Sequence, residues 1–344
     1  PVAGAIAAGN RVMLKPSEWT PKTSTLIAEL ASEAFEPDEF AVFEGGIETG
    51  RAFSELSFDQ LLFTGSTRVA KEVSNSAAKN LTPLTLELGG KSPALVCPGA
   101  NLKRAAERIV FGKLANAGQI CIAPDYVFVE RAKFHDFIEL LQTFIKKAYP
   151  RLNNNPDYTS IISADHFTRL NRMIEEARKD GAEIISINPD GETLESSARK
   201  IPPTLILRPN PTLGVMQEEI FGPILPVLSY EKIEEAIEFV QHRARPLALY
   251  LFTEKTRERE RILRETVSGG VAVNEVLFHC VCETLPFGGV GASGMGSYHG
   301  QAGFDTFSHL KPVFIQPRFN FNFFLVPPIT PMKRLFAKIF RKLV

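Results

Sequence analysis

Residues 86–93, LELGGKSP, and residues 116–125, NAGQICIAPD, are the two stretches around which the chain is organised. The first places Glu87 beside a Gly-Gly pair at the end of an apolar, strand-like run. The second presents Cys121 in a loop of small residues. A thiolate nucleophile and a general base are the two groups that covalent chemistry at a carbonyl requires. Taken singly, Cys121 is more simply interpreted as an inert buried thiol and Glu87 as an ordinary surface acid. Only the two stretches together indicate a catalytic site.

Together and in this wording, the two stretches resemble the aldehyde dehydrogenase superfamily. Residues 121–126, CIAPDY, are most similar to its class 3 branch, which includes the fatty and aromatic aldehyde enzymes. The resemblance covers residues 1–312. It implies NAD(P)-dependent oxidation of a medium- or long-chain aliphatic or aromatic aldehyde to the acid. Cys121 would form the thiohemiacetal and thioester, and Glu87 would activate the water that releases the acid.

Composition sets ordinary bounds. The 344 residues are 44% apolar and 23% charged, which is typical of a soluble globular protein of about two domains. Lys+Arg and Asp+Glu number 39 each, which argues against a nucleic-acid partner. The four cysteines show no framework spacing and favour a reducing, intracellular compartment. The chain opens on Pro1 in the middle of a pattern, so we expect an N-terminally truncated fragment.

Short strands alternate with helices from the start to about residue 86. We expect strands at 12–14, 40–43 and 60–63, a helix at 22–35, and another through Val69, Val73 and Ala77. This alternation predicts an α/β fold with a doubly wound, mostly parallel sheet. With the resemblance, residues 1–89 become the C-terminal part of an NAD(P)-binding domain.

The turn that begins at Gly65 and Ser66 links a strand to a helix, a layout that aims backbone N–H groups at phosphate. It lacks the third glycine of the dinucleotide fingerprint, and Ala70 stands where the family has its final glycine. The resemblance assigns the cofactor pyrophosphate to this turn. Residues 289–294, GVGASG, match the fingerprint by letter, but Pro286 precedes them and no good helix follows. We interpret them as a glycine-rich loop lining the active site.

The resemblance supplies the remaining cofactor contacts. Lys15 and Glu18 would bind the adenosine ribose, although a helix-entry turn capped by Ser17 is an equal reading of the residues alone. An acid at Glu18 favours NAD over NADP, and NADP stays possible because class 3 enzymes are permissive. Glu219 would bind the nicotinamide ribose and Phe221 would lie against the nicotinamide ring.

The second domain is expected at 90–296, as an α/β catalytic domain that carries the nucleophile. A return segment follows at 297–312. The predicted helices are 101–116, 131–148, 163–180, 231–241 and 255–266, and the predicted strands lie near 92–96, 126–130, 203–207, 224–229, 248–252 and 270–273. His279, Cys280 and Cys282 lack a fourth ligand, so no metal is expected.

Residues 313–344 form a basic amphipathic tail. Residues 311–344 hold seven Lys or Arg and no acid, which leaves a net −7 on the rest of the chain. After Pro331, apolar residues recur at helical spacing, with most cations on the opposite face. The apolar set is Met332, Leu335, Phe336, Ile339, Phe340 and Leu343, preceded by the anchors Phe321, Phe323, Phe324, Leu325 and Val326. This composition predicts a helix lying in a membrane interface, and packing on the protein's own body or on a dimer partner is the alternative.

The resemblance also implies a homodimer. It would lie in the cytoplasm or on the cytosolic face of an organelle membrane, either the endoplasmic reticulum or the mitochondrial outer membrane.

Three alternatives to an active aldehyde dehydrogenase remain. An acylating enzyme would pass the thioester to coenzyme A and needs no base at Glu87. A scaffold relative is expected to have lost Cys121 or Glu87. A truncated fragment lacking the upstream oxyanion asparagine would be inactive.

Overall fold

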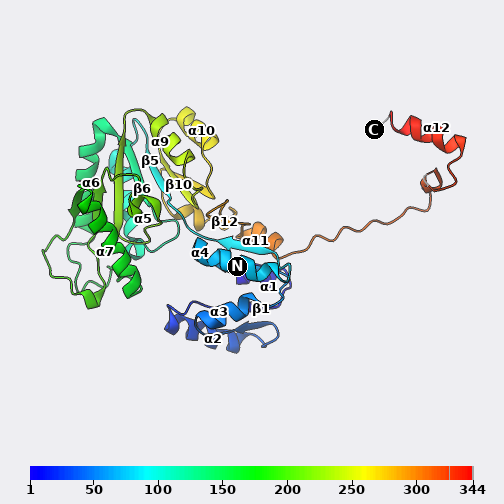
Figure 1. The fold of residues 1–344 in the computed structure, drawn as a ribbon, viewed down its shortest axis with the longest axis horizontal. Helices are drawn as coiled ribbons and strands as arrows, with labels where there is room; N and C mark the ends of the chain where they lie inside the picture. Colours follow the sequence, from blue (N-terminus) through cyan, green and yellow to red (C-terminus); the bar gives the residue numbers. More distant parts are fainter. Residues whose placement is uncertain (325, 343–344) are drawn as a thin grey trace. The chain divides into compact units, whose positions relative to one another are not determined.

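A seven-stranded sheet forms the centre of the fold (Figure 1). The computed structural model describes residues 1–324 and 326–342, and it divides into two compact units, Pro1–Ser308 and His309–Val344. In the first unit the strand order of the large sheet is β11 (Gly270–Val273), β10 (Ala248–Phe252), β5 (Pro93–Val96), β6 (Tyr126–Glu130), β9 (Ile224–Tyr230), β8 (Thr204–Leu207) and β7 (Glu183–Ser186). All neighbours are parallel except β7 with β8. The expected α/β class is therefore confirmed.

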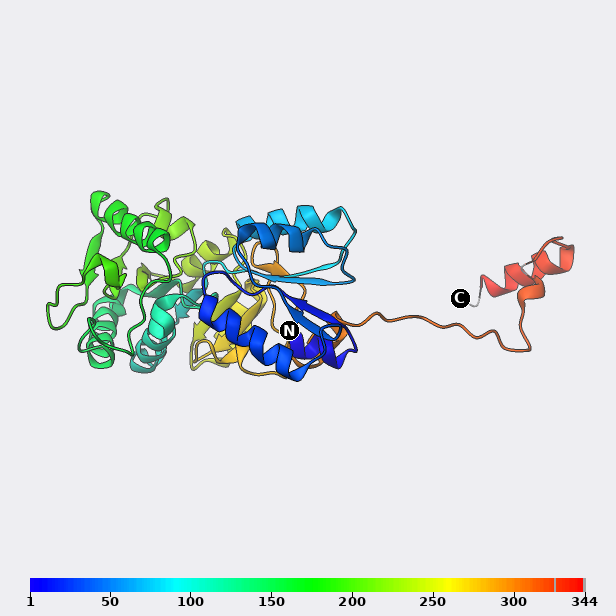
Figure 2. The same cartoon turned by 90° about the horizontal axis from the view of Figure 1, so that it is seen from below.

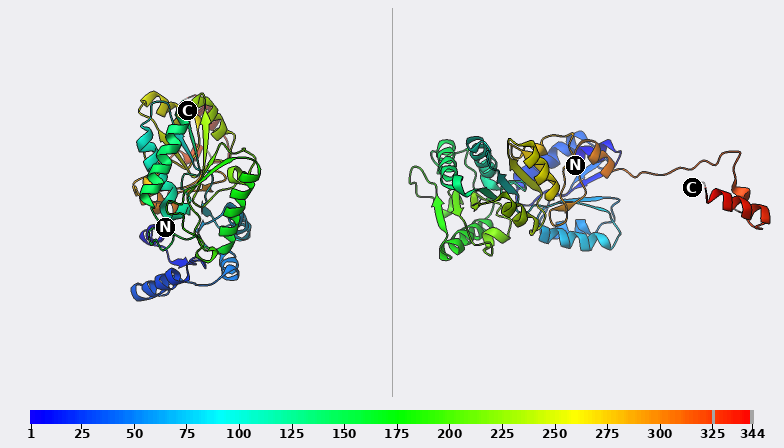
Figure 3. Two further views of the ribbon diagram at one scale, coloured as in Figure 1. Left: turned by 90° about the vertical axis from the view of Figure 1, so that its left-hand side faces the viewer. Right: turned by 90° about the horizontal axis from the view of Figure 1, so that it is seen from above.

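Both faces of this sheet are covered, because side chains alternate between them along each strand. In β6, Val127 and Val129 join one apolar cluster, whereas Tyr126 and Phe128 join the other. The first cluster is completed by α5 (Leu102–Leu114) and α6 (Phe134–Ala148). The second is completed by α7 (Ala164–Lys179), α9 (Ile233–Gln241) and α10 (Thr256–Glu265), so the sheet lies between two layers of helices (Figure 3).

The first ninety residues form smaller sheets. Strands β1 (Val12–Leu14) and β2 (Phe40–Val42) pair in parallel, as do β3 (Leu61–Thr64) and β4 (Leu84–Glu87), and β12 (Gly294–Met295) adds antiparallel to β4. The helices are α1 (Val2–Ala7), α2 (Pro21–Ala34), α3 (Ile47–Ser54) and α4 (Thr67–Ala78). Figure 2 shows α3 and α4 packed side by side.

The predicted strands and the long helices are present, with shifts at their ends. The helix expected at 101–116 ends at Leu114, because Asn116 and Ala117 take left-handed backbone angles (φ 49° and 51°). The helix expected from 131 begins at Phe134, after a 3-10 turn at Arg131–Lys133. Four short helices, α1, α3, α8 (Gly214–Gln217) and α11 (Gly300–Thr306), and the strands β7 and β12 had no sequence signal.

Residues 1–308 cluster as one compact unit. The expected domain limits at 89, 296 and 312 therefore remain predictions about how that unit is subdivided.

The second unit contains a 3-10 turn, Asn322–Phe324, and the helix α12 (Pro331–Phe340). The helix starts as predicted, with Pro331 in the first position and the Thr330 side chain accepting from the Lys333 N–H at 3.4 Å. Phe336 stacks on Phe324 with ring centroids 4.1 Å apart. Leu325 and Leu343 of the predicted apolar set lie outside the described residues. Across residues 1–324 and 326–342, the helices are too short or too polar to cross a bilayer.

Core packing on the α5 face yields a stability prediction. Ile109 is fully buried in the first apolar cluster, whereas Ile47, at the start of α3, is 63% exposed. Ile109→Ala should lower the free energy of unfolding by about 2–5 kcal/mol, and Ile47→Ala by less than about 0.5 kcal/mol. Urea titrations of the two variants followed by circular dichroism measure the difference, and equal midpoints would contradict the packing described.

Candidate active site

Glu87 ends β4 in the middle of its small sheet. Its backbone pairs with Thr64 of β3 on one side and with Gly294 of β12 on the other. Gly294 has φ 146°, and a Cβ there would lie 2.1 Å from the Leu86 carbonyl oxygen, so only glycine fits this approach. The glycine-rich loop 289–294 therefore packs against the strand that carries the acid, instead of opening a dinucleotide-binding helix.

The Glu87 carboxylate is buried and unpaired. The residue is 3% exposed, and neither carboxylate oxygen has a hydrogen-bond partner within the described residues. Burial raises the pKa of Glu87 to about 8. An isolated buried acid is costly to maintain, and such groups concentrate at functional sites.

Cys121 lies on a sharply turned loop. Asn116, Ala117 and Gly118 all have positive φ, and a Cβ at Gly118 would lie 2.3 Å from the Gly222 carbonyl oxygen. Burial, then the charges of Glu219 and Glu87, raise the pKa of the Cys121 thiol to about 11. The charges of Glu219 and Glu87 thus both act on the Cys121 thiol.

Two tyrosines, Tyr250 and Tyr298, belong to the surroundings of Cys121. The Tyr250 hydroxyl donates to the Ile122 carbonyl and so fixes the loop next to Cys121. Burial, followed by the charges of Glu87 and Cys121, raises the pKa of Tyr298 to about 12. Neither tyrosine was a sequence candidate, although Tyr298 stands in a stretch, 297–300, that carries the family resemblance.

Glu219 folds back onto the glycine pair of the first motif. A Cβ at Gly89 would lie 2.2 Å from a Glu219 carboxylate oxygen, so this position tolerates only glycine while Glu219 is in place. Burial, with the charge of Asp125 next, raises the pKa of Glu219 to about 7. Phe221 has φ 49°, and its ring centroid lies 6.4 Å from that of His166.

The predicted phosphate turn adjoins the acid. The Gly65 N–H donates to the Glu87 carbonyl at 3.1 Å, and the Ser66 side chain caps α4 by accepting from the Val69 N–H at 3.4 Å. A cavity of about 760 Å³ connects Thr67, the next residue, with Gly89 and Glu219. The lining residues extend from Thr67, at the N-terminus of α4, to the Glu219 carboxylate. A helix N-terminus suits the phosphates of a dinucleotide, and a carboxylate suits its ribose hydroxyls.

Lys15 and Glu18 contact each other. They form a 2.8 Å ion pair, and the Lys15 hydrogen bond lowers the pKa of Glu18. Ser17 caps no helix; its hydroxyl accepts from the Trp19 N–H at 3.2 Å, and α2 starts after Thr20. Of the predicted cofactor residues, Glu219 lines the 760 Å³ cavity, whereas Lys15, Glu18, Gly65, Ser66 and Phe221 do not.

The other thiols and the histidine form no metal centre. The His279 ring lies between Tyr250 and Phe287, at 5.9 and 6.2 Å, with both ring nitrogens buried and unpartnered in the part of the chain that the structure describes. No cluster of His, Cys, Asp and Glu suited to a metal ion occurs among residues 1–324 and 326–342.

Comparison with known proteins identifies the family. The sequence profile of the "Aldehyde dehydrogenase family" matches residues 1–313. The chain belongs to the aldehyde dehydrogenase family.

The similar proteins include bacterial and mammalian relatives. A "Probable coniferyl aldehyde dehydrogenase" of Caulobacter vibrioides is 52% identical over 92% of this chain and 65% of its own length. "Aldehyde dehydrogenase family 3 member A2" of Rattus norvegicus is 42% identical over 99% and 69%, which supports the class 3 resemblance. The structure "Substrate bound state of Staphylococcus Aureus AldH" superimposes with a TM-score of 0.90 at 43% identity, covering 99% of this chain and 73% of that one. The chain spans about two thirds of the length of the curated relatives it matches.

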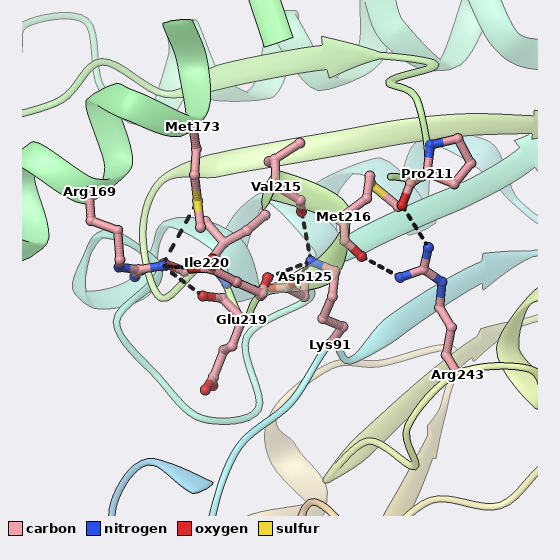
Figure 4. A network of polar contacts seen from close by, with 11 residues as sticks. Lys91, Asp125, Arg169, Met173, Pro211, Val215, Met216, Glu219, Ile220 and Arg243 are labelled. Atoms are coloured by element: carbon pink, nitrogen blue, oxygen red, sulfur yellow. Dashed lines mark hydrogen bonds and ion pairs between the residues drawn. The ribbon is translucent and has the colours of Figure 1, made fainter. Parts of the chain in front are cut away.

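This member of the family holds its site together with residues that sequence reasoning missed (Figure 4). Lys91 and Asp125 form a buried ion pair, and Arg169 of α7 donates to the backbone carbonyls of Glu219 and Ile220. Lys91 and Asp125 stand in the two motifs quoted at the outset, but their pairing depends on strand register. Arg169 lies in an ordinary amphipathic helix and had no local signal.

The isolated charge of Glu87 makes stability depend on pH. A folded pKa of about 8 lies above the ordinary value of 4.5. The folded state therefore holds the proton more tightly, and Glu87 costs stability as pH rises from about 4.5 to about 8. Glu87→Gln removes this cost and should be more stable than the wild type by about 4 kcal/mol at pH 8, with the gain falling below about 1 kcal/mol at pH 5. Urea midpoints measured from pH 5 to 9 test this, and a pH-independent difference would contradict the unpaired carboxylate.

Proposed function

We propose that the chain is the nucleophile-bearing part of an aldehyde dehydrogenase that uses NAD to oxidise an aldehyde to its acid. The observation that carries the proposal is the buried, unpartnered Glu87 carboxylate whose charge acts on Cys121. A nucleophile and a base within reach of one another make up the machinery for forming and hydrolysing a thioester.

Cys121 has the role of nucleophile. Once the thiol proton has left to solvent, the thiolate sulfur adds to the aldehyde carbon, and the carbonyl oxygen becomes an oxyanion that needs donors. The Cys121 N–H donates to no backbone carbonyl in the described part of the chain, so it can serve as one. Loss of a donor of this kind typically costs about 3 kcal/mol in barrier.

NAD is the proposed cofactor. When bound, it would accept the hydride that leaves the substrate carbon. The cavity from Thr67 to Glu219 supports this choice, as does a neighbouring structure, "Crystal Structure of Indole-3-acetaldehyde Dehydrogenase in complexed with NAD+", at a TM-score of 0.84 and 29% identity. Gly65, Ser66 and Glu219 would hold the pyrophosphate and nicotinamide ribose, Phe221 would face the ring, and Lys15 and Glu18 would hold the adenosine ribose. The acid at Glu18 disfavours a 2′-phosphate, and NADP remains the alternative.

Glu87 completes the cycle by taking a proton from the water that attacks the thioester. A pKa of about 8 keeps the carboxylate a usable base near neutral pH. The need for a base argues against transfer of the acyl group to coenzyme A, and the presence of both groups argues against a scaffold protein.

The substrate proposal extends to aromatic as well as medium- and long-chain aliphatic aldehydes. Relatives at 48–52% identity carry coniferyl aldehyde in their names. The bacterial origin of these three relatives gives no support to an organelle membrane. A homodimer remains a proposal that rests on the family resemblance.

Substitution of the nucleophile tests the chemistry. In the full-length protein, Cys121→Ala should abolish NAD-dependent aldehyde oxidation and hydrolysis of a p-nitrophenyl ester, because both require the thiolate. Cys97→Ala, Cys280→Ala and Cys282→Ala serve as matched controls and should retain both activities. Turnover by the Cys121→Ala enzyme in either assay would rule out the assignment.

We also propose that the tail binds an anionic membrane surface. Met332, Leu335 and Ile339 of α12 are exposed, whereas Lys333 is buried, with its ammonium 4.3 Å from the Phe323 ring centroid. Of the other cations of this stretch, Arg334, Lys338 and Arg341 fall on the opposite side of the predicted helical wheel, and Lys342 lies at the edge of the apolar face. Each basic residue near an anionic leaflet contributes about 1 kcal/mol, which supports surface binding at low salt.

Vesicle flotation separates this proposal from its alternative. The full-length protein should float with phosphatidylserine-containing vesicles at low salt, and a form ending at Pro317 should not, because it lacks the apolar face and six of the seven cations. Equal flotation of the two forms, or of neither, would leave packing of the tail on the protein itself as the explanation.

A further inference from the structure

The segment 215–221, which carries Glu219 and Phe221, is held by charged side chains through its backbone (Figure 4). Lys91 donates to the carbonyls of Val215 at 2.8 Å and Glu218 at 3.0 Å. Its third N–H is used by the ion pair with Asp125, so the ammonium has no donor left for a ligand. Lys91 therefore acts on the segment even though it borders the cavity.

Asp125 holds the same segment from the other side. One carboxylate oxygen binds Lys91, and the other accepts from the Ile220 N–H at 3.0 Å. The side chains of Lys91 and Asp125 are 9% and 4% exposed. Asp125 also ends the nucleophile loop, and its N–H donates to the Ser92 carbonyl at 2.8 Å. The Lys91–Asp125 pair thus connects three parts of the chain. They are the loop that carries Cys121, the residues just before β5, and the segment 215–221.

Arg169 supplies an independent hold on this segment. Its guanidinium donates to the Glu219 carbonyl at 3.0 Å and to the Ile220 carbonyl at 2.6 Å. It does not line the 760 Å³ cavity, and it reaches the segment from α7. An effect of Arg169 on cofactor binding would therefore pass through the position of Glu219 and Phe221.

We infer that Lys91, Asp125 and Arg169 are positioning residues that set the nicotinamide end of the cofactor site, and that the Lys91–Asp125 pair also sets the nucleophile loop. This inference rests on the proposed function. It predicts that substitutions of Arg169 and of Lys91 have different effects. Arg169 acts on the nicotinamide end alone, Lys91 acts on that end and on Cys121, and neither contacts Lys15 or Glu18, to which the resemblance assigns the adenosine end.

The test uses three assays on the full-length enzyme with Lys91→Met, Arg169→Met and the control Arg172→Met. Arg172 is on the same helix as Arg169, but it pairs with Glu176 at the surface and is 60% exposed. The assays are the KM for NAD in aldehyde oxidation, inhibition by ADP, which reports the adenosine end, and hydrolysis of a p-nitrophenyl ester without cofactor, which reports Cys121.

Arg169→Met should raise the KM for NAD at least tenfold while ADP inhibition and ester hydrolysis stay within threefold of wild type. Lys91→Met should raise that KM and also slow ester hydrolysis at least tenfold, with ADP inhibition retained. Arg172→Met should match the wild type in all three assays.

Several results would overturn the inference. A wild-type KM for NAD in Arg169→Met would do so, as would ester hydrolysis by Lys91→Met at the wild-type rate. Parallel loss of ADP inhibition in Arg169→Met would indicate general unfolding and contradict a local positioning role. If Lys91→Met does not fold, the Arg169 result decides. A wild-type enzyme without NAD-dependent turnover would instead contradict the proposed function.

Discussion

The buried ion pair between Lys91 and Asp125 is the constraint on which the site depends. Burying an ammonium is costly unless every N–H finds an acceptor, and here the acceptors are a carboxylate and two backbone carbonyls. Those acceptors come from parts of the chain far apart in sequence. The pair can form only when β5 and β6 lie in their observed register, with Pro93 opposite Tyr126, because this register places the residues just before each strand side by side.

This arrangement explains an unusual feature of the site's location. In parallel α/β sheets, ligands usually bind at the carboxyl ends of the strands. Here Glu87 does lie at the carboxyl end of its strand, β4. Lys91, in contrast, precedes the amino end of β5, and Cys121 and Asp125 precede the amino end of β6. The site thus lies where the carboxyl end of the small sheet meets the amino end of the large one. The Lys91–Asp125 ion pair stabilises the segments that the large sheet contributes to this site.

The two kinds of buried charge at the junction have opposite consequences. Lys91 is fully partnered, and the charge of Asp125 opposes the lowering of its pKa by burial, so it can hold backbone in place. Glu87 has no partner among the described residues, and its raised pKa makes it available for proton transfer. Most of the large elements could be predicted from periodicity, and Glu87 and Cys121 could be selected as candidates from the wording of their motifs. The roles of Lys91, Asp125 and Arg169 could not, because they arise from register and from a helix packed across the sheet. Asn116 is a residue type that favours a positive φ, but the positive φ of Ala117, which follows it, has no signature in the sequence.

The most direct test of the proposed chemistry is the pre-steady-state behaviour of Glu87→Gln in the full-length enzyme. On rapid mixing with NAD and an aromatic aldehyde, the account predicts a burst of NADH equal to the concentration of active sites, then turnover slowed at least a hundredfold. Mass spectrometry should find the acyl group on Cys121, because the thioester forms but is not hydrolysed. Unchanged steady turnover, or a missing burst with normal thiol reactivity, would contradict the assignment of Glu87 to thioester hydrolysis.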